Sequence, residues 1–447
     1  MSEPRALERR LGLREATALN MIDMVGIGPF TVMPLVMKEL PGAMSLAAWV
    51  AGALLAMLDA TVWAELGASL PEAGGSFVFL RRIYDPESLG KMMSFLFVWQ
   101  TTIQAPLVVA SGAIGFAQYF GYLYPVGTIG SKCISGLVVI VLTMLLYRSI
   151  ESVGKITMLL WIGVIGTIIW IVVSGAINFN ASLAFSHGAT NDLGLLLSVA
   201  LGHATINTVY SYLGYYNVCH LGSEIVNPGR VIPRSIFLSI IGIALLYIAM
   251  QSSVLGVLPW KAASQSQFIF STFMEHLYGT KVASIATIMI LWIAFSSLFA
   301  VMLGYSRIPY AAAKDGAFFK IFARVHPTKH FPNVSLIALA VAGFAFSMLF
   351  KLSEVITAIL AMRIMIQFIG QAIGLMLWRK REPGASRPFR TPLFPLAAIA
   401  AIVAWIWLYA AIDTVFQLAG LAMIASGIVI YLIRARTQSE WPFALVR

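Results

Sequence analysis

The chain has 447 residues, of which 59% are hydrophobic and only 11% are charged, and its formal net charge is +11. This composition excludes a soluble globular domain and a disordered chain. The two cysteines, Cys133 and Cys219, lie in apolar runs, so we expect small buried residues rather than a disulfide framework.

The apolar residues gather in runs of about 20, a length that crosses a bilayer as a helix. The sequence therefore predicts an all-α multispanning membrane protein with about twelve transmembrane helices, and the loops leave no room for a soluble domain. The expected spans are 17–38, 44–68, 90–121, 131–148, 155–175, 194–222, 233–258, 280–306, 332–350, 354–378, 392–412 and 415–434.

The basic residues predict the orientation of these spans, because cytoplasmic loops of membrane proteins are rich in Lys and Arg. With the N-terminus inside, 24 Lys and Arg residues fall in cytoplasmic segments and 5 on the opposite side. We expect a multi-pass protein of the cell membrane with both termini cytoplasmic. This asymmetry explains the positive charge without any nucleic acid, and membrane lipid is an expected partner.

The first span contains Gly26-Ile27-Gly28-Pro29. Glycine exposes the backbone and proline lacks an N–H donor, so this stretch predicts a break in the helix. In lipid a break is tolerated only where its freed polar groups face protein or a water-filled cavity. Near the bilayer midplane, transporters use such half-helix ends to hold small charged substrates. Close helix packing is the alternative role for the two glycines, but it does not explain Pro29.

The sixth span is unusually polar over residues 203–220, and its polar groups need partners inside the protein. Gly214, among polar aromatic residues, predicts a local unwinding. Two interrupted helices at corresponding positions predict a five-plus-five inverted repeat with the site between the halves. We expect one transporter domain with a cytoplasmic segment 1–16, repeats 17–175 and 194–378, peripheral helices 392–434 and a cytoplasmic tail 435–447.

Five stretches, in order along nearly the whole chain, resemble motifs of the amino acid–polyamine–organocation superfamily of permeases. Within this superfamily they resemble most the L-type amino acid transporter branch. They are Gly26-Ile27-Gly28-Pro29-Phe30, Ala64-Glu65-Leu66-Gly67 with Leu70-Pro71 and 74–80, the runs 224–233 and 306–316, and Arg387-Pro388-Phe389-Arg390-Thr391-Pro392. The five together are specific, whereas the glycine motif alone is weak.

The resemblance implies a secondary active transporter that moves amino acids by alternating access. It implies that the substrate carboxylate meets N–H groups at Ile27 and Gly28, while the ammonium meets carbonyls on both interrupted helices. A zwitterion would then match two opposed half-helix dipoles. The expected substrate-binding residues are Met24, Val25, Gly26, Ile27, Gly28, Tyr210, Ser211, Tyr212, Leu213, Tyr215 and Tyr216.

Departures from the family leave the substrate open. The L-type branch usually has Trp-Asn where this chain has Tyr215-Tyr216, and a small residue where it has Leu213. The Gly28-Pro29-Phe30 motif resembles that of a plant polyamine-uptake branch, so a polyamine or organic cation transporter of the same fold is one alternative. Against it, the middle of the sixth span has no carboxylate, and Asp23 is the only nearby candidate. A nutrient sensor that binds without transport is another alternative.

Charged residues inside a span are functional hypotheses, because burying a charge in a membrane costs several kcal/mol. Asp23 and Asp59 are expected at similar depth on neighbouring helices. They either share a proton or each pairs locally. Arg363, in the tenth span, contacts a substrate carboxylate, holds an outer gate or has a structural partner; these roles stay open.

The coupling ion is open between proton and sodium. Many sodium-independent relatives carry a lysine in the fifth span, and residues 156–174 contain none. Ser296 and Ser297 either provide hydroxyl ligands for sodium or bond their own backbone. His203 and His220 either relay protons or are structural, and Glu224 is expected to anchor the inner end of the sixth span. We expect no cofactor and no resident metal.

Other protein classes fit the sequence less well. An enzyme would need a nucleophile–base pair or metal ligands at paired spacing, and no such pattern occurs. A channel would need a polar stripe through several helices, whereas polarity here concentrates at the two breaks. No partner subunit is evident, so the expected partner is a small-molecule amino acid substrate.

Overall fold

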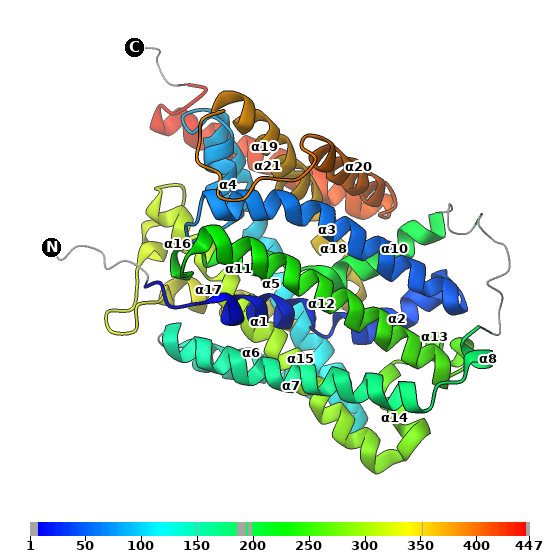
Figure 1. Cartoon of the computed structure of the whole chain (residues 1–447). Helices are drawn as coiled ribbons and strands as arrows, with labels where there is room; N and C mark the ends of the chain where they lie inside the picture. The colour runs from blue at the N-terminus through cyan, green and yellow to red at the C-terminus, as the bar shows by residue number, and fades with distance from the viewer. Residues whose placement is uncertain (1–7, 149, 186–193, 195–198, 351, 444–447) are drawn as a thin grey trace.

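The computed structural model describes residues 8–148, 150–185, 194, 199–350 and 352–443. Helices dominate this part of the chain, and its only β pairing is two isolated bridges, Leu11 with Ile225 and Ala73 with Leu221. The long helices lie side by side in one bundle (Figure 1). The predicted all-α multispanning fold is confirmed.

Eight helical stretches among the described residues are long and apolar enough to cross a membrane, and a bent pair makes a ninth. The bent pair is α1 (Leu13–Met24) and α2 (Gly28–Glu39). The helices that form the eight stretches are α3 (Ser45–Ser69), α5 (Leu89–Leu123), α6 (Thr128–Leu146), α7 (Ile150–Ile177), α12 (Pro228–Val257), α15 (Thr280–Tyr305) with α16 (Arg307–Lys314), α18 (Leu352–Arg363) with α19 (Gly370–Arg381), and α21 (Thr414–Gln438).

Three shorter helices lie where the sixth, ninth and eleventh spans are predicted: α10 (Val199–Tyr212), α17 (Asn333–Leu349) and α20 (Leu396–Ala410). The count of twelve, the inverted repeat and the boundaries 17–175, 194–378 and 392–434 therefore stay predictions. Part of the sixth span, 195–198, lies outside the described residues, as do 1–7 and 444–447 of the terminal segments. The remaining short helices are α4 (Ser76–Ile83), α8 (Ala181–Ala184), α11 (Asn217–His220), α13 (Trp260–Gln265) and α14 (Ile269–Tyr278).

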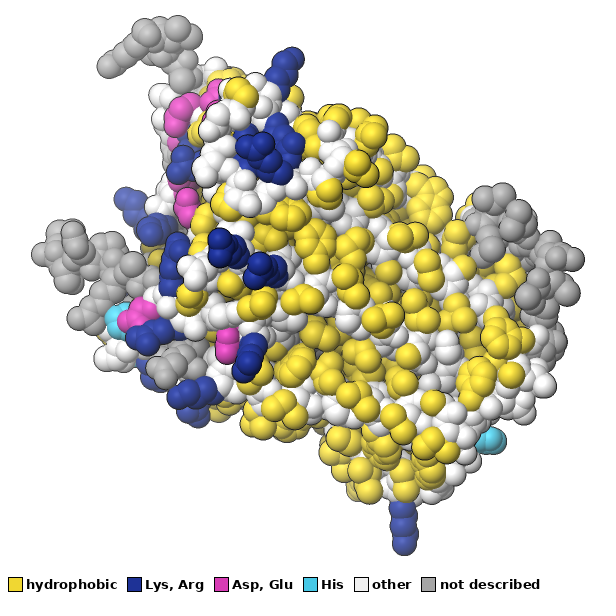
Figure 2. All heavy atoms as spheres, viewed as in Figure 1, with side chains coloured by type: hydrophobic (Ala, Val, Ile, Leu, Met, Phe, Trp, Pro, Cys, Tyr) yellow, Lys and Arg dark blue, Asp and Glu magenta, His cyan; other side chains and the backbone are white. Residues whose placement is uncertain are grey.

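The surface separates an apolar belt from a basic end. Large apolar side chains point outward from several long helices, among them Leu54, Met144, Ile162, Leu245 and Val341. Figure 2 shows hydrophobic side chains (yellow) spread across the bundle, with most Lys and Arg (dark blue) gathered at the left, where α4 and α16 lie in Figure 1. We call this end the basic end; it includes Arg81, Arg82, Lys314 and Arg379. An exposed apolar belt of this kind fits a lipid environment.

One sequence expectation is wrong at this surface. Cys219 is buried, as predicted, but Cys133 is exposed on α6. The prediction assumed that an apolar run is buried in protein, whereas a membrane helix turns one of its apolar faces toward lipid.

The interrupted segments lie in the middle of the bundle. α1 packs against α7, α12 and α15, while α10 packs against α2 and α3. The longest helices therefore surround both interruptions, and the freed backbone groups face protein rather than lipid.

The basic end is closed by contacts between distant segments. The N–H of Ala73 donates to Ser223 Oγ at 2.9 Å, and the N–H of Gly74 donates to the carbonyl of His220 at 3.0 Å. Glu224, which the sequence predicts to anchor this end, forms a buried two-bond ion pair with Arg307 at 3.0 and 3.2 Å. These contacts hold α11 against the segments that follow α3 and α15.

Candidate substrate-binding site

The first interruption separates α1 from α2. α1 ends at Met24, α2 begins at Gly28, and the two helices are bent by 46°. Pro29 lies in the first turn of α2, where a missing N–H costs nothing. Within the described residues, the N–H groups of Gly26, Ile27 and Gly28 have no hydrogen-bond acceptor. They form the positive end of the α2 dipole.

The second interruption covers residues 213–216, between α10 and α11. Gly214 has φ = +120°, a conformation that residues with a side chain rarely adopt. A Cβ added at this position would lie 2.8 Å from the carboxyl carbon of Asp23. Glycine is thus required twice, for the backbone turn and for the close approach of Asp23.

The two interruptions face each other. A Cβ at Gly28 would lie 3.3 Å from both Tyr210 and Ser211. The Tyr247 hydroxyl, from α12, lies 2.7 Å from the Met24 carbonyl oxygen and 3.1 Å from that of Ser211. One phenol therefore ties the end of α1 to α10.

A small cavity of about 60 Å³ lies between the interruptions. Most of the predicted substrate-binding residues line this cavity: Met24, Gly26, Ile27, Gly28, Tyr210, Ser211, Leu213 and Tyr216. Three of the residues predicted to act in coupling or gating line it as well: Asp23, Ser297 and Arg363. Ser111 and Tyr305 also line the cavity, and the Ser111 and Tyr210 hydroxyls lie 3.1 Å apart.

Three predicted substrate-binding residues do not line this cavity. Val25 is fully buried, and the Tyr212 hydroxyl donates to the Trp49 carbonyl at 3.2 Å. The Tyr215 side chain points away from the cavity, and its hydroxyl donates to the Asp59 carboxylate. These side chains support the interruptions from behind.

Arg363 is the buried cation of the cavity, with 2% of its surface exposed. It donates to the Tyr216 hydroxyl, and the Gln104 amide oxygen, turned toward it, accepts from Nη2 and Nε at 2.5 and 2.6 Å. The guanidinium also lies over the Tyr305 ring, 5.3 Å from its centre. Within the described part of the chain, no carboxylate lies within 4.0 Å of Arg363.

The two predicted acidic residues have separate partners. Asp23 borders the cavity beside Gly214. Asp59 lies behind the second interruption, where it accepts from Tyr215 and from Trp405 Nε1. A proton shared directly between them stays a prediction, and the geometry gives each carboxylate its own environment.

The two predicted serines differ. Ser296 donates to the Trp292 carbonyl of its own helix at 2.6 Å, the structural alternative for this residue. Ser297 instead donates to the Asp23 carbonyl, across to α1, at 3.2 Å. Of the two serines, only Ser297 therefore places its hydroxyl beside a carbonyl of α1 at the cavity wall, as a sodium ligand would require.

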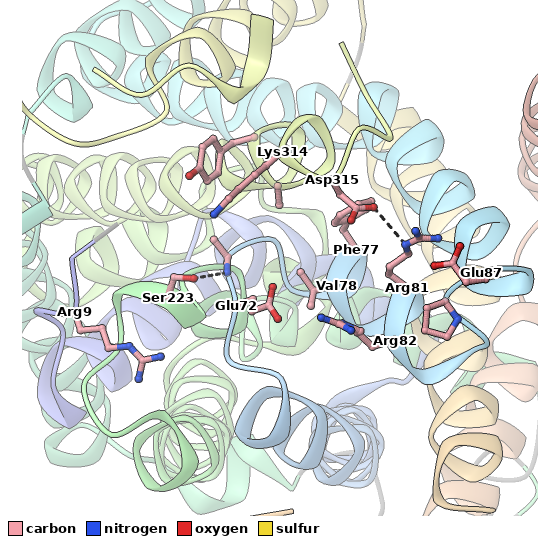
Figure 3. A pocket seen from close by; sticks show the side chains of 14 residues that line it. Arg9, Glu72, Phe77, Val78, Arg81, Arg82, Glu87, Ser223, Lys314 and Asp315 are labelled. Carbon is pink, nitrogen blue, oxygen red and sulfur yellow. Dashed lines mark hydrogen bonds and ion pairs between the residues drawn. The ribbon is translucent and has the colours of Figure 1, made fainter. Parts of the chain in front are cut away.

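A larger cavity, about 610 Å³, opens at the basic end (Figure 3). Charged side chains of both signs line it, and Arg81 forms an ion pair with Asp315 at 3.3 Å. Figure 3 shows Arg81 and Asp315 facing one another, with Lys314 beside Asp315 on the same segment and Arg9 on the N-terminal segment. None of the predicted substrate-binding residues lines this cavity.

Comparison with known proteins decides the family. A family profile described as amino acid permease matches residues 11–445. The chain belongs to this family. The permease is 26% identical to the serine/threonine exchanger SteT of Bacillus subtilis (strain 168) over 90% of each chain. It is 22% identical to the methylthioribose transporter of the same organism, over 98% of this chain and 96% of that one. It is 24% identical to the human cystine/glutamate transporter, over 87% of this chain and 77% of that one.

These findings make the protein a multi-pass membrane protein and an amino acid permease. Sequence reasoning missed several residues at its candidate site, among them Tyr247, Gln104 and Tyr305. A signal for Gln104 existed, because Gln100 and Gln104 stand four residues apart on one face of a predominantly apolar helix. Tyr247 and Tyr305 stand alone in apolar runs, where nothing distinguishes them from core aromatics.

Proposed function

We propose that this permease is a secondary transporter that carries a zwitterionic amino acid across the cell membrane by alternating access. The observation that carries the proposal is the set of unpaired N–H groups at Gly26, Ile27 and Gly28, beside a cavity that both interruptions share. Amide groups at a helix N-terminus bind carboxylates, because the dipole and the free donors act together.

The ammonium group of the substrate is then held on the opposite side of the cavity. The Met24 and Ser211 carbonyl oxygens accept hydrogen bonds from the Tyr247 hydroxyl, and each oxygen keeps a second lone pair that can accept from the ammonium group. The Asp23 carboxylate, at the cavity wall, supplies the negative charge. This arrangement orients the zwitterion along the line between α1 and α2.

Arg363 favours an amino acid over a polyamine. A polycation would bring a second positive charge toward a buried guanidinium that lacks a carboxylate partner. Like charges in a low-dielectric site repel strongly. The relatives that are named for amino acids point the same way.

In the transport cycle, the basic end faces the cytoplasm and opens by separating the contacts that close it. The predicted repeats 17–175 and 194–378 would move against each other around the two interruptions. The Arg81–Asp315 and Ala73–Ser223 contacts lie on this route and would break together.

The test is counterflow in proteoliposomes that contain the purified full chain. Vesicles preloaded with unlabelled serine, threonine, leucine, glutamate, putrescine or methylthioribose are diluted into the same compound in radiolabelled form. We expect transient accumulation of one or more of the amino acids, and none of putrescine. Binding of an amino acid without any counterflow would indicate a sensor, and counterflow confined to putrescine or methylthioribose would contradict an amino acid substrate.

A further inference from the structure

Asp59 is a carboxylate buried in the middle of the membrane-spanning region. Its side chain is on α3, and the residue is 1% exposed. Ten residues separate it from the helix end at Ser69, a distance of about 15 Å along the axis. A bilayer core of about 30 Å then places Asp59 close to its midplane.

Asp59 differs from the other fully buried acids in having no cationic partner. Glu65 pairs with Arg379 at 2.5 Å, and Glu224 pairs with Arg307 at 3.0 Å. Asp59 receives only neutral donors, the Tyr215 hydroxyl and Trp405 Nε1, the latter at 3.0 Å. Within the described ranges, no Lys, Arg or His nitrogen lies within 4.0 Å of its carboxylate.

The helices packed around α3 bring no charge to Asp59. α20 carries no titratable residue except Tyr409. The titratable groups on the other packed elements are Glu65 on α3 itself, Lys38 and Glu39 at the far end of α2, Tyr216 in the second interruption, His203, Tyr210 and Tyr212 on α10, Arg230, Arg234 and Tyr247 on α12, and Arg379, Lys380 and Arg381 on α19. An ionised carboxylate at this position is thus held by hydrogen bonds alone, and binding a proton removes the cost of burying its charge.

The partners of Asp59 connect it to the substrate cavity from two sides. Tyr215 stands between Gly214 and Tyr216, which both line the cavity. On the other side, Trp405 stacks on Phe368, with ring centres 4.1 Å apart. Phe368 lies in the π-helical turn Ile364–Ile369 that directly follows Arg363, and Arg363 donates to Tyr216. π-Helical turns of this kind are frequent at functional sites.

We propose that Asp59 is the proton-binding residue of the transport cycle, so that each substrate movement carries one proton through this carboxylate. This proposal rests on the proposed function, since it assigns the coupling ion to that same carrier. An O–H bond forms at Asp59 with a proton from the outer aqueous side and breaks when the proton leaves to the cytoplasm. When the second interruption rearranges, Tyr215 ceases to donate and the carboxylate takes the proton; when the hydrogen bond returns, the proton leaves.

The experiment compares wild type with Asp59→Asn in sodium-free proteoliposomes that contain a pH-sensitive dye. The substrate is the amino acid with the strongest counterflow. Wild type should accumulate it when the outside is acidic and should acidify the lumen with it. Asp59→Asn should lose both effects by at least about tenfold and should keep counterflow at equal pH. Asp413→Asn, in the exposed turn before α21, is the matched control and should behave as wild type.

A second variant, Trp405→Phe, keeps the test decisive if Asp59→Asn does not fold. It removes one neutral donor to the carboxylate, which favours the protonated form. The pH at which uptake is half-maximal should rise by about one unit. Wild-type proton movement in Asp59→Asn or an unshifted midpoint in Trp405→Phe would overturn the proposal. So would a wild type that shows counterflow but neither accumulates the substrate nor acidifies the lumen when the outside is acidic. If the wild type shows no counterflow with any of the amino acids, that result would contradict the proposed transport function rather than the role of Asp59.

Discussion

Gly214 is the residue at which backbone conformation and site geometry meet most tightly. Its φ of +120° excludes side chains, and its missing Cβ leaves room for the Asp23 carboxyl group. Any larger residue must therefore change the backbone and push Asp23 away from the cavity wall. Gly26 has a related role, because a Cβ there would lie 2.5 Å from Ser297 Oγ.

Gly214→Ala should reduce counterflow by at least about tenfold, because backbone strain of this kind costs about 1–3 kcal/mol and the methyl group displaces Asp23. The measurement is the initial counterflow rate in proteoliposomes, normalised to reconstituted protein. Gly166→Ala, on α7 where an added Cβ meets nothing within 4 Å, is the control and should transport normally. Normal transport by Gly214→Ala would show that the turn is not required.

At the scale of helices, the interruptions are held by a third element. α12 places the Tyr247 hydroxyl against carbonyls from α1 and α10, so both broken segments share one donor. This arrangement lets the interruptions move together, since a shift of either one disturbs the same phenol.

Tyr247→Phe should destabilise the permease by about 1–3 kcal/mol, because two buried carbonyls lose their donor without any loss of packing. Thermal unfolding in detergent measures this change as a lower midpoint temperature. Tyr124→Phe, at an exposed position, provides the control and should leave the midpoint in place. Equal midpoints for the two variants would argue against Tyr247 as the link.

The helices themselves could be predicted closely, but the directions of side chains at the interruptions could not. The predicted span 280–306 matches α15 (Thr280–Tyr305), since length and hydrophobicity define a membrane helix. In a break the helical period of 3.6 residues is lost. Sequence spacing therefore cannot reveal that Tyr216 faces the cavity while Tyr215 faces Asp59. The π-helical turn after Arg363 shifts the register of the tenth span in the same way.

At the scale of the whole molecule, the cavity between the interruptions and the cavity at the basic end share no lining residue, and Ala73 and Ser223, which form one of the closing contacts, line the second cavity. The Glu224–Arg307 ion pair is the most buried of these contacts. Removing one partner of such a pair costs about 3–5 kcal/mol, because the other charge stays buried without compensation.

Glu224→Gln should therefore shift the permease toward states in which the basic end is open. Cys219, buried on α11, reports this opening in a Cys133→Ser background. Its reaction rate with a membrane-impermeant maleimide, added from the basic side, should rise roughly tenfold or more. Glu87→Gln, at an exposed residue that pairs with Lys91, should leave the rate unchanged. An unchanged rate in Glu224→Gln would indicate that this ion pair does not hold the end closed.

A substrate site between the two interruptions is tested most directly by amino acid binding to purified wild type and Gly28→Val. A valine side chain here would project toward Tyr210 and Ser211, into the space between the interruptions. We expect Gly28→Val to remain folded but to bind the transported amino acid at least about 100-fold more weakly, because the carboxylate site is filled. Wild-type affinity in Gly28→Val would contradict a substrate site between the two interruptions.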